Sequence, residues 1–459
     1  MSEKTTLADI EARLQRNGIH EIRQIARACG VQSPTSGKKE RIIADLMKIA
    51  SGEEQPVSPS LRGAPPKSQA YDRLLVADIE RCRAECIARR AGAAAKPEAI
   101  VQVESPVGEV EEETATSQNA KGVLYFYDKY AFLSVGNSEI SRADDIFVHE
   151  SFVRRFNLKE GDEIECAAQR KDSERAPALV GVLTVNGLPP SALTRAPFDG
   201  APAVYPYKKI PLAQSGAEGR IIDLFSPLAA GQRGLIVGSA RRGATTLLYK
   251  IATALRENHE DICTVCLLVG ARPEEISDFK AIDGATVFHT AFHFAEEEKA
   301  RVADLALEYC KRQAELGKDV VLLLDNANRL ARAYGFSMPK NPNKPGNIFG
   351  FISSARATKD GGSLSVISAL SLGDNPADES LYVGLRDACN MQITLSDELA
   401  IGGLYPAIDV KKSLSAHAEK FCLPDDVTLA ASARSLPADK IINEAHISCT
   451  FAQFKNSLK

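Results

Sequence analysis

A short loop at residues 238–245 constrains the fold of this chain more than any other feature. It reads GSARRGAT, follows the apolar run GLIV and precedes the helix-forming sequence TLLYKIA. Glycines in a loop between a strand and a helix let backbone N–H groups and the helix N-terminus face an anion, as in phosphate-binding loops. Ala244, however, stands where the pattern G-x-x-x-x-G-K-S/T has its phosphate-binding lysine. The sequence therefore predicts a nucleotide-binding fold with altered chemistry.

Strands and helices alternate around this loop. The apolar patterns predict strands at residues 234–237, 264–269, 319–324 and 363–370, and helices at residues 246–258 and 297–316. Such alternation is typical of a mostly parallel sheet with helices on both faces. We therefore predict an α/β domain over residues 216–459, with the loop at its first crossover.

The chain before residue 216 has a different character. Residues 1–50 carry helical periodicity, which predicts a small helical domain. Residues 51–119 are rich in Pro, Ser, Glu and Ala, which predicts a flexible acidic linker with one helix at residues 71–90. Five short strands of period two predict an oligonucleotide-binding barrel over residues 120–186, followed by a connector at residues 187–215. The predicted fold is multidomain, with α+β and α/β parts.

Three aromatic residues fall on the predicted barrel strands, namely Tyr130, Phe132 and Phe147. Alternate strand positions can place them on one exposed face, where each would stack a base and contribute about 1–3 kcal/mol to binding. The alternative is that some of them fill the barrel core. The periodicity alone does not decide between these two arrangements.

Composition sets the broad class of protein. The chain is 44% hydrophobic and 25% charged, which is ordinary for a globular protein. It has no cationic leader followed by an apolar stretch and no apolar run of about eighteen residues, so we expect a cytoplasmic protein without a membrane partner. A net charge of −4 neither indicates nor excludes nucleic-acid binding, because a basic groove can be local.

The ten cysteines form no regular framework, so we expect free thiols in a reducing compartment. Cys263 and Cys266 are three residues apart in a predicted buried strand, where a structural role is favoured over metal binding. His289 and His293 also lack the companion ligands of a zinc site.

The run DVVLLLD ends in Asp325, the pattern that places a carboxylate near Mg²⁺ in phosphate-loop proteins. NANRLARAY follows it, and together the two closely resemble the signature of the bacterial transcription termination factor Rho family. The resemblance extends to IDLFSP and GQRGLIV before the loop, to RPEE, GGSL and YPAID after it, and to DDIFV, RRFNL and GD in the predicted barrel. It covers nearly all of the chain outside the linker.

This resemblance implies a hexameric ring of RecA-like domains, a homo-oligomer that binds single-stranded, pyrimidine-rich RNA and hydrolyses ATP. It implies that Tyr130, Phe132 and Phe147 form the primary RNA site, and that Arg329 and Arg332 lie near a subunit interface. Thr245 and Asp325 would hold Mg²⁺. The implied nucleotide-binding residues are Gly238, Arg241, Arg242, Gly243, Thr245, Thr246, Asp325 and Tyr405.

The departures from the family fall on its chemistry. Ala244 replaces the phosphate-binding lysine, and Gly270-Ala271 replaces an acidic pair that includes the expected general base. Ala416 stands at the position of the finger arginine. We therefore expect ATP and Mg²⁺ to bind weakly. Side chains that could take over these roles are Arg241, Arg242, Glu274, Glu275, Lys411 and Lys412.

The RNA loops of the implied central channel are altered as well. Residues 339–346 replace a glycine-bearing loop, and Arg386 replaces a lysine, followed by Asp387, Ala388 and Cys389. Arg386 still offers a positive charge to a phosphate.

Three functions follow from this pattern. The first is an RNA-binding transcription termination or regulatory factor of the Rho type whose ATP hydrolysis is lost or strongly reduced. The second is an active, divergent RNA-dependent ATPase that terminates transcription. The third is a non-catalytic, ring-forming regulator that acts on Rho or on RNA polymerase.

Overall fold

The structure, a computed structural model, describes most of residues 117–459 and a smaller set nearer the N-terminus. The first part leaves out residues 128–129, 136–144, 171–175, 336–346, 360 and 374, and the second part consists of residues 10, 13–15, 17–29, 31, 39–51 and 79. The replaced RNA loop at residues 339–346 and nearly all of the predicted linker lie outside these ranges. No helix within them is long and apolar enough to cross a membrane.

The chain divides into two compact units, residues 1–110 and residues 111–459. The first unit contains α2 (Ile19–Ala28) and α3 (Lys39–Ala50). Their apolar faces pack together with Ile10 and Leu14, as the helical periodicity predicts. Ile79, from the predicted linker, also joins this core.

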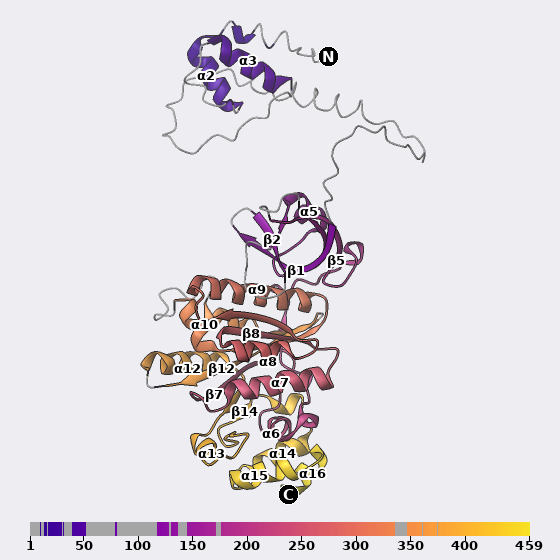
Figure 1. Cartoon of the computed structure of the whole chain (residues 1–459), viewed down its shortest axis with the longest axis vertical. Helices are drawn as coiled ribbons and strands as arrows, with labels where there is room; N and C mark the ends of the chain where they lie inside the picture. Colours follow the sequence, from indigo (N-terminus) through magenta and orange to yellow (C-terminus); the bar gives the residue numbers. More distant parts are fainter. Residues whose placement is uncertain are drawn as a thin grey trace, which may run out of the picture. The chain divides into compact units, whose positions relative to one another are not determined.

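The second unit begins with a closed five-stranded barrel of strand order β1-β2-β3-β5-β4 (Figure 1). The strands are β1 (Ser117–Tyr127), β2 (Tyr130–Val135), β3 (Ile146–Val148), β4 (Glu163–Gln169) and β5 (Ala178–Val185). The first strand starts three residues before the predicted boundary at residue 120. A short helix, α5 (Glu150–Phe156), was not predicted; His149 caps its N-terminus and Asn157 ends it in the left-handed conformation.

The remainder of this unit is an α/β domain built on a mostly parallel sheet of order β14-β13-β7-β12-β10-β8-β9. The sheet strands are β7 (Arg233–Ser239), β8 (Cys263–Ala271), β9 (Thr286–Ala291), β10 (Asp319–Asp325), β12 (Ser363–Leu372), β13 (Met391–Thr394) and β14 (Leu414–Ser415). Strand β14 is antiparallel to β13, and an edge pair, β6 (Ala203–Val204) with β11 (Arg356–Thr358), extends the sheet beside β12. The predicted parallel sheet is confirmed.

Helices cover both faces of this sheet, and each face has its own apolar core (Figure 1). One face packs against α6 (Ala217–Phe225), α7 (Ala244–Asn258), α8 (Pro273–Lys280), α14 (Pro424–Ala433), α15 (Ala438–Ile447) and α16 (Phe451–Ser457). The other packs against α9 (Glu296–Glu315), α10 (Ala327–Ala333), α11 (Ile348–Ser353) and α12 (Pro376–Ala388). The loop at residues 238–245 therefore sits at the carboxyl end of a strand that is buried on both faces.

A polar network joins the barrel, the connector and α9. Arg195 donates to Asp162 at 2.7 Å, and Asn186 donates to the second oxygen of the same carboxylate at 2.8 Å. Gln313 of α9 donates to Asn186 at 3.4 Å. The Arg195 and Asp162 side chains are only 8% and 0% exposed, so this ion pair is buried.

Candidate functional site: a phosphate loop without its lysine

The phosphate loop has the local geometry that its sequence predicts. Strand β7 ends at Ser239 and α7 begins at Ala244. Gly243 caps the helix with φ of 93°, in the left-handed region that glycine adopts most easily. Ala244 is half-buried and packs against the core beneath α7. The loop thus has the shape of an anion site, while the position of the lysine carries only a methyl group.

Thr245 and Asp325 meet at the base of the loop. The Thr245 hydroxyl donates to the Asp325 carboxylate at 2.8 Å. Burial raises the pKa of Asp325, and Glu275 adds to the rise, while the Thr245 hydrogen bond and Arg329 lower it. A hydroxyl beside a carboxylate suits the oxygen preference of Mg²⁺, so this pair fits the predicted metal position.

Arg242, a predicted substitute for the lysine, is bound elsewhere. Its Nε donates to Asp397 at 2.9 Å, and Ser239 donates to the other oxygen of that carboxylate at 2.8 Å. Asp397 is the first residue of α13 (Asp397–Ile401). Arg241 is exposed and has φ of 65°. Of the two arginines, Arg242 is therefore held to one side of the loop by an acidic partner.

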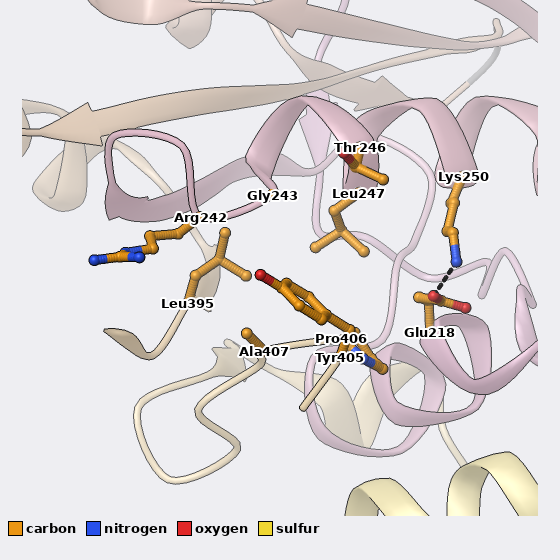
Figure 2. Close-up of a pocket in the computed structure, with 10 residues that line it drawn as sticks. All are labelled: Glu218, Arg242, Gly243, Thr246, Leu247, Lys250, Leu395, Tyr405, Pro406 and Ala407. Atoms are coloured by element: carbon orange, nitrogen blue, oxygen red, sulfur yellow. Dashed lines mark hydrogen bonds and ion pairs between the residues drawn. The ribbon is translucent and has the colours of Figure 1, made fainter. Parts of the chain in front are cut away.

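A pocket of about 130 Å³ opens beside the first two turns of α7. Figure 2 shows the Tyr405 ring lying beneath Thr246 and Leu247, with Arg242 toward one end. Tyr405 is 50% exposed, so one face of its ring is open to a ligand. An ion pair between Lys250 and Glu218 lines the opposite end. A flat aromatic ligand attached to phosphates fits this arrangement, because its ring would stack on Tyr405 while its phosphates reach the loop.

The position of the expected general base carries no polar side chain. Ala271 ends β8 and is buried, and Gly270 precedes it with φ of 56°. The nearest acidic substitute, Glu275, accepts a hydrogen bond at 3.0 Å from the backbone N–H of Arg272 and so caps α8. Glu274 is exposed.

Ala416 lies at the far edge of the sheet. Its backbone N–H donates to Asn390, and the N–H of Asn390 donates to the carbonyl of Arg233, the first residue of β7. The phosphate loop follows the other end of the same strand. Ala416, and any side chain substituted for it, is therefore remote from the phosphate loop of its own chain. Lys411 and Lys412 are exposed and lie at the other end of β14, where the carbonyl of Lys412 accepts a hydrogen bond from Thr394 at 3.4 Å.

The remaining predicted arginines lie on two helices, α10 and α12. Arg329 in α10 is half-buried and donates to the carbonyl of Val269 at 3.3 Å, whereas Arg332 is exposed. Arg386 lies in the last turn of α12, half exposed, with its guanidinium 3.6 Å from Asp387. The altered segment that begins at Arg386 thus starts as helix.

The three barrel aromatics form one patch. Phe132 and Phe147 are partners across β2 and β3, with ring centroids 5.8 Å apart, and Tyr130 lies 6.1 Å from Phe147. Tyr130 is 57% exposed, while Phe132 and Phe147 are half-buried. The barrel core holds the alternate strand positions Ala131, Leu133, Ile146 and Val148 and none of the three aromatics, so the alternative that some of them fill the core is wrong. All three face outward, with the Tyr130 ring open and the two phenylalanines packed beside it.

The cysteine and histidine pairs do not converge. Cys263 packs on the α9 side of the sheet and Cys266 on the α7 side, so the two thiols cannot share one ion. Burial raises their pKa values to about 11 and about 12. His289 is buried in β9, whereas His293 is exposed in the following loop.

Two contacts at the site were not predicted from the sequence, namely the hydrogen bond from Arg242 to Asp397 and the ion pair between Lys250 and Glu218. Asp397 lies 158 positions from Ser239 in the chain, and local sequence patterns do not predict a contact over such a separation. Lys250 and Glu218 are 32 positions apart, on separate helices.

Comparison with known proteins agrees with this architecture. Residues 120–191 match the Rho termination factor RNA-binding domain, and residues 219–415 match the nucleotide-binding domain of the ATP synthase alpha/beta family. A solved ATPase of a type III secretion system aligns with 63% of this chain and 93% of its own, at 21% sequence identity and a TM-score of 0.46. This similarity is too low to assign a fold or a function.

Several relatives carry the name transcription termination factor Rho. The protein from Thermotoga maritima is 34% identical over 67% of this chain and 76% of its own length, and that from Karelsulcia muelleri is 34% identical over 64% and 82%. The Borreliella burgdorferi protein is 37% identical over 62% of this chain, and the match spans 58% of that protein. The chain therefore belongs to the transcription termination factor Rho family.

Proposed function

We propose that this chain is an RNA-binding transcription termination or regulatory factor whose ATP hydrolysis is lost or strongly reduced. The observation that carries the proposal is the presence of alanine at three chemically separate positions, Ala244, Ala271 and Ala416. A lysine about 4 Å from a phosphate is worth on the order of 4 kcal/mol at an effective dielectric of 20. Loss of a finger arginine slows phosphoryl transfer by about 10³–10⁵-fold. These losses are not additive, but one of them suffices to stop turnover.

The neighbours of these positions support the same conclusion. Arg242 is paired with Asp397, and Glu275 is engaged in capping α8, so neither is free without breaking an existing contact. Lys412 is paired with Asp409 at 3.5 Å, and Lys411 and Lys412 are both exposed to solvent. Turnover would require rearrangement at each of these places.

RNA binding is the activity that we propose to be retained. The matched RNA-binding domain includes the aromatic patch, and Tyr130 offers an open ring for a base. We propose single-stranded, pyrimidine-rich RNA as the ligand and a homo-oligomer, a hexamer by family resemblance, as the working form. In that assembly Arg329 and Arg332 would lie near a neighbouring subunit, and Arg386 would face RNA phosphates.

In this proposal the nucleotide is a bound ligand that is not hydrolysed. Tyr405 and Thr246 would hold the base and ribose end, the loop from Gly238 to Gly243 would meet the phosphates, and Thr245 with Asp325 would hold Mg²⁺. We expect this binding to be weak because Ala244 supplies no charge.

Phosphate release from ATP tests the proposal, with and without poly-pyrimidine RNA, and with an Asp325→Ala variant as the control. The proposal predicts no RNA-stimulated release above that of the control. RNA-stimulated turnover on the order of 1 s⁻¹ that Asp325→Ala abolishes would establish the second candidate, an active motor. The specific observation that favours that candidate is Glu275, whose charge acts on Asp325 and which could move to activate water.

The third candidate is a regulator of Rho or RNA polymerase that uses neither nucleotide nor RNA. A measurement of RNA binding distinguishes it from our proposal. If the chain binds no RNA at low salt while remaining folded and oligomeric, that candidate replaces our proposal.

A further inference from the structure

Two cations converge at the carboxyl end of β8, where the acidic pair is absent. Lys299 of α9 is 7% exposed, and its ammonium is 2.8 Å from Glu296. The Glu296 side chain is 51% exposed, so this partner is itself free to turn toward water. Among the described residues, no other ion pair of Lys299 is found. A nearly buried ammonium whose one ion-pair partner is half exposed gains from a second anion.

Arg329 approaches the same point from α10. Its guanidinium donates to the carbonyl of Val269 at 3.3 Å and lies 5.0 Å from the centre of the exposed Phe292 ring. Val269 directly follows Leu268, which is the register partner of Asp325 on the neighbouring strand β10. Arg329 therefore lies at the strand end beside Asp325, at the base of the phosphate loop.

Gly270 leaves space between these two cations. A Cβ atom built on Gly270 would lie 3.6 Å from Cδ of Arg329 and 3.8 Å from Cε of Lys299, both ordinary contact distances. Among the described residues other than Val269, Gly270 and Ala271, these are the only atoms within 4 Å of that point, and neither belongs to a carboxylate. The two side chains thus border a small space without an acidic group.

We propose that Lys299 and Arg329 form an anion subsite that takes a terminal phosphate group. The subsite lies at the carboxyl ends of β8 and β10, where open α/β sheets bind their ligands. Two converging donors with positive charge suit a phosphate, and a nearly dry ammonium gains more from such an anion than an exposed one. The charge missing at Ala244 is thereby supplied from the opposite side of the site.

This subsite would hold a phosphate without activating water, because lysine and arginine are not bases at neutral pH. The inference rests on the proposed function in so far as the phosphate belongs to a nucleotide. Free inorganic phosphate carries the same kind of anionic group, and the experiment below distinguishes it from the terminal phosphate of a nucleotide.

The test compares Lys299→Met with Lys311→Met in the full chain. Lys311 is a matched control, since it also lies in α9, has a side chain only 11% exposed, and pairs with Asp199 and Glu308 away from the subsite. Binding of a non-hydrolysable ATP analogue, of ADP and of sodium phosphate is measured by titration calorimetry with Mg²⁺ present. We expect Lys299→Met to weaken the ATP analogue about 10- to 100-fold, the range for a hydrogen bond to a charged group, and ADP less than threefold. Lys311→Met should change neither.

A second variant tests the same subsite in case Lys299→Met fails to fold. Gly270→Asp places a carboxylate between the two cations, and aspartate tolerates positive φ better than most residues. It should remove the preference for the ATP analogue over ADP in the same way. If phosphate alone binds and needs Lys299, the ligand is free phosphate; if only the ATP analogue needs it, the ligand is a nucleotide.

Equal weakening of the ATP analogue and ADP, equal effects of Lys299→Met and Lys311→Met, or no binding of any of these anions would overturn the subsite. None of these readouts depends on hydrolysis. RNA-stimulated phosphate release would contradict the proposed function and leave the subsite standing.

Discussion

Ala244 is the residue at which the phosphate loop departs most from its pattern. We predict that Ala244→Lys strengthens ATP binding by about 10- to 100-fold, because a lysine there adds a hydrogen bond to a charged phosphate. Turnover should not return, since Ala271 and Ala416 remain. Titration with ATP and Mg²⁺ measures the change. Ala240→Lys is the control, because it adds the same charge at an exposed loop position; an equal gain in both variants would mean that net charge alone is responsible.

His289 makes stability depend on pH. Within the described part of the chain, neither of its ring nitrogens has a hydrogen-bond partner, and burial, aided by the charge of Lys280, lowers its pKa from 6.5 to about 4. The unfolded chain therefore binds a proton between pH 6.5 and 4 that the folded chain does not, so the free energy of unfolding falls as the pH drops through this window. Above pH 6.5 the contribution of His289 is constant.

We predict that His289→Leu reduces this loss of stability, because leucine fills a similar space without a titrating group. Urea unfolding at pH 7 and pH 5 measures the difference, with exposed His293→Leu as the control. An unchanged pH dependence in His289→Leu would show that the imidazole is hydrated in the folded protein.

At the level of single elements, strands β2 and β3 carry the aromatic patch that we propose binds RNA. We predict that Tyr130→Ala combined with Phe132→Ala weakens binding of poly-pyrimidine RNA by about 1–3 kcal/mol per aromatic residue, tenfold or more in total. Fluorescence anisotropy at several salt concentrations measures it. Tyr205→Ala is a matched control, because Tyr205 is 61% exposed but lies outside the barrel. Equal affinities in all three proteins would place the RNA site elsewhere.

Elements were predictable from the sequence where their patterns are local. Buried strands such as β10 and long amphipathic helices such as α9 follow directly from apolar periodicity. Helix α5 was not predicted, because it has only seven residues and its N-terminus is capped by His149, which is not a usual N-capping residue. Whether an aromatic on a barrel strand faces inward or outward also depends on barrel closure, which the alternation of residues does not specify.

Side-chain partnerships at the site were predictable only in part. Family resemblance identified Thr245 and Asp325, which do meet. It also suggested Arg242 as a substitute for the lysine, but the bond from Arg242 to Asp397 joins residues 155 positions apart. Such a contact is decided by how α13 packs beside the phosphate loop, and a sequence pattern cannot supply that information.

At the scale of the whole second unit, the buried Arg195–Asp162 pair joins the connector to the barrel. We predict that Arg195→Met lowers the free energy of unfolding by about 3–5 kcal/mol, since it leaves the Asp162 charge buried without its partner. Arg154→Met is the control. It removes an ion pair of similar length, 2.6 Å to Glu150, whose side chains are 78% and 67% exposed, so it should cost less than about 1 kcal/mol. Similar losses in both variants, measured by urea unfolding, would contradict the role of burial.

The molecule as a whole combines an RNA-binding barrel with a nucleotide-binding domain that lacks charged groups at three chemical positions. We therefore expect this chain to bind RNA without RNA-driven hydrolysis of ATP. One titration measures both: labelled poly-pyrimidine RNA is followed by anisotropy while a phosphate sensor reports hydrolysis of saturating ATP in the same sample. We predict that the anisotropy saturates while phosphate release stays at the level of Asp325→Ala. Phosphate release that rises with RNA occupancy and disappears in Asp325→Ala would contradict this expectation and identify the chain as an active RNA-dependent ATPase.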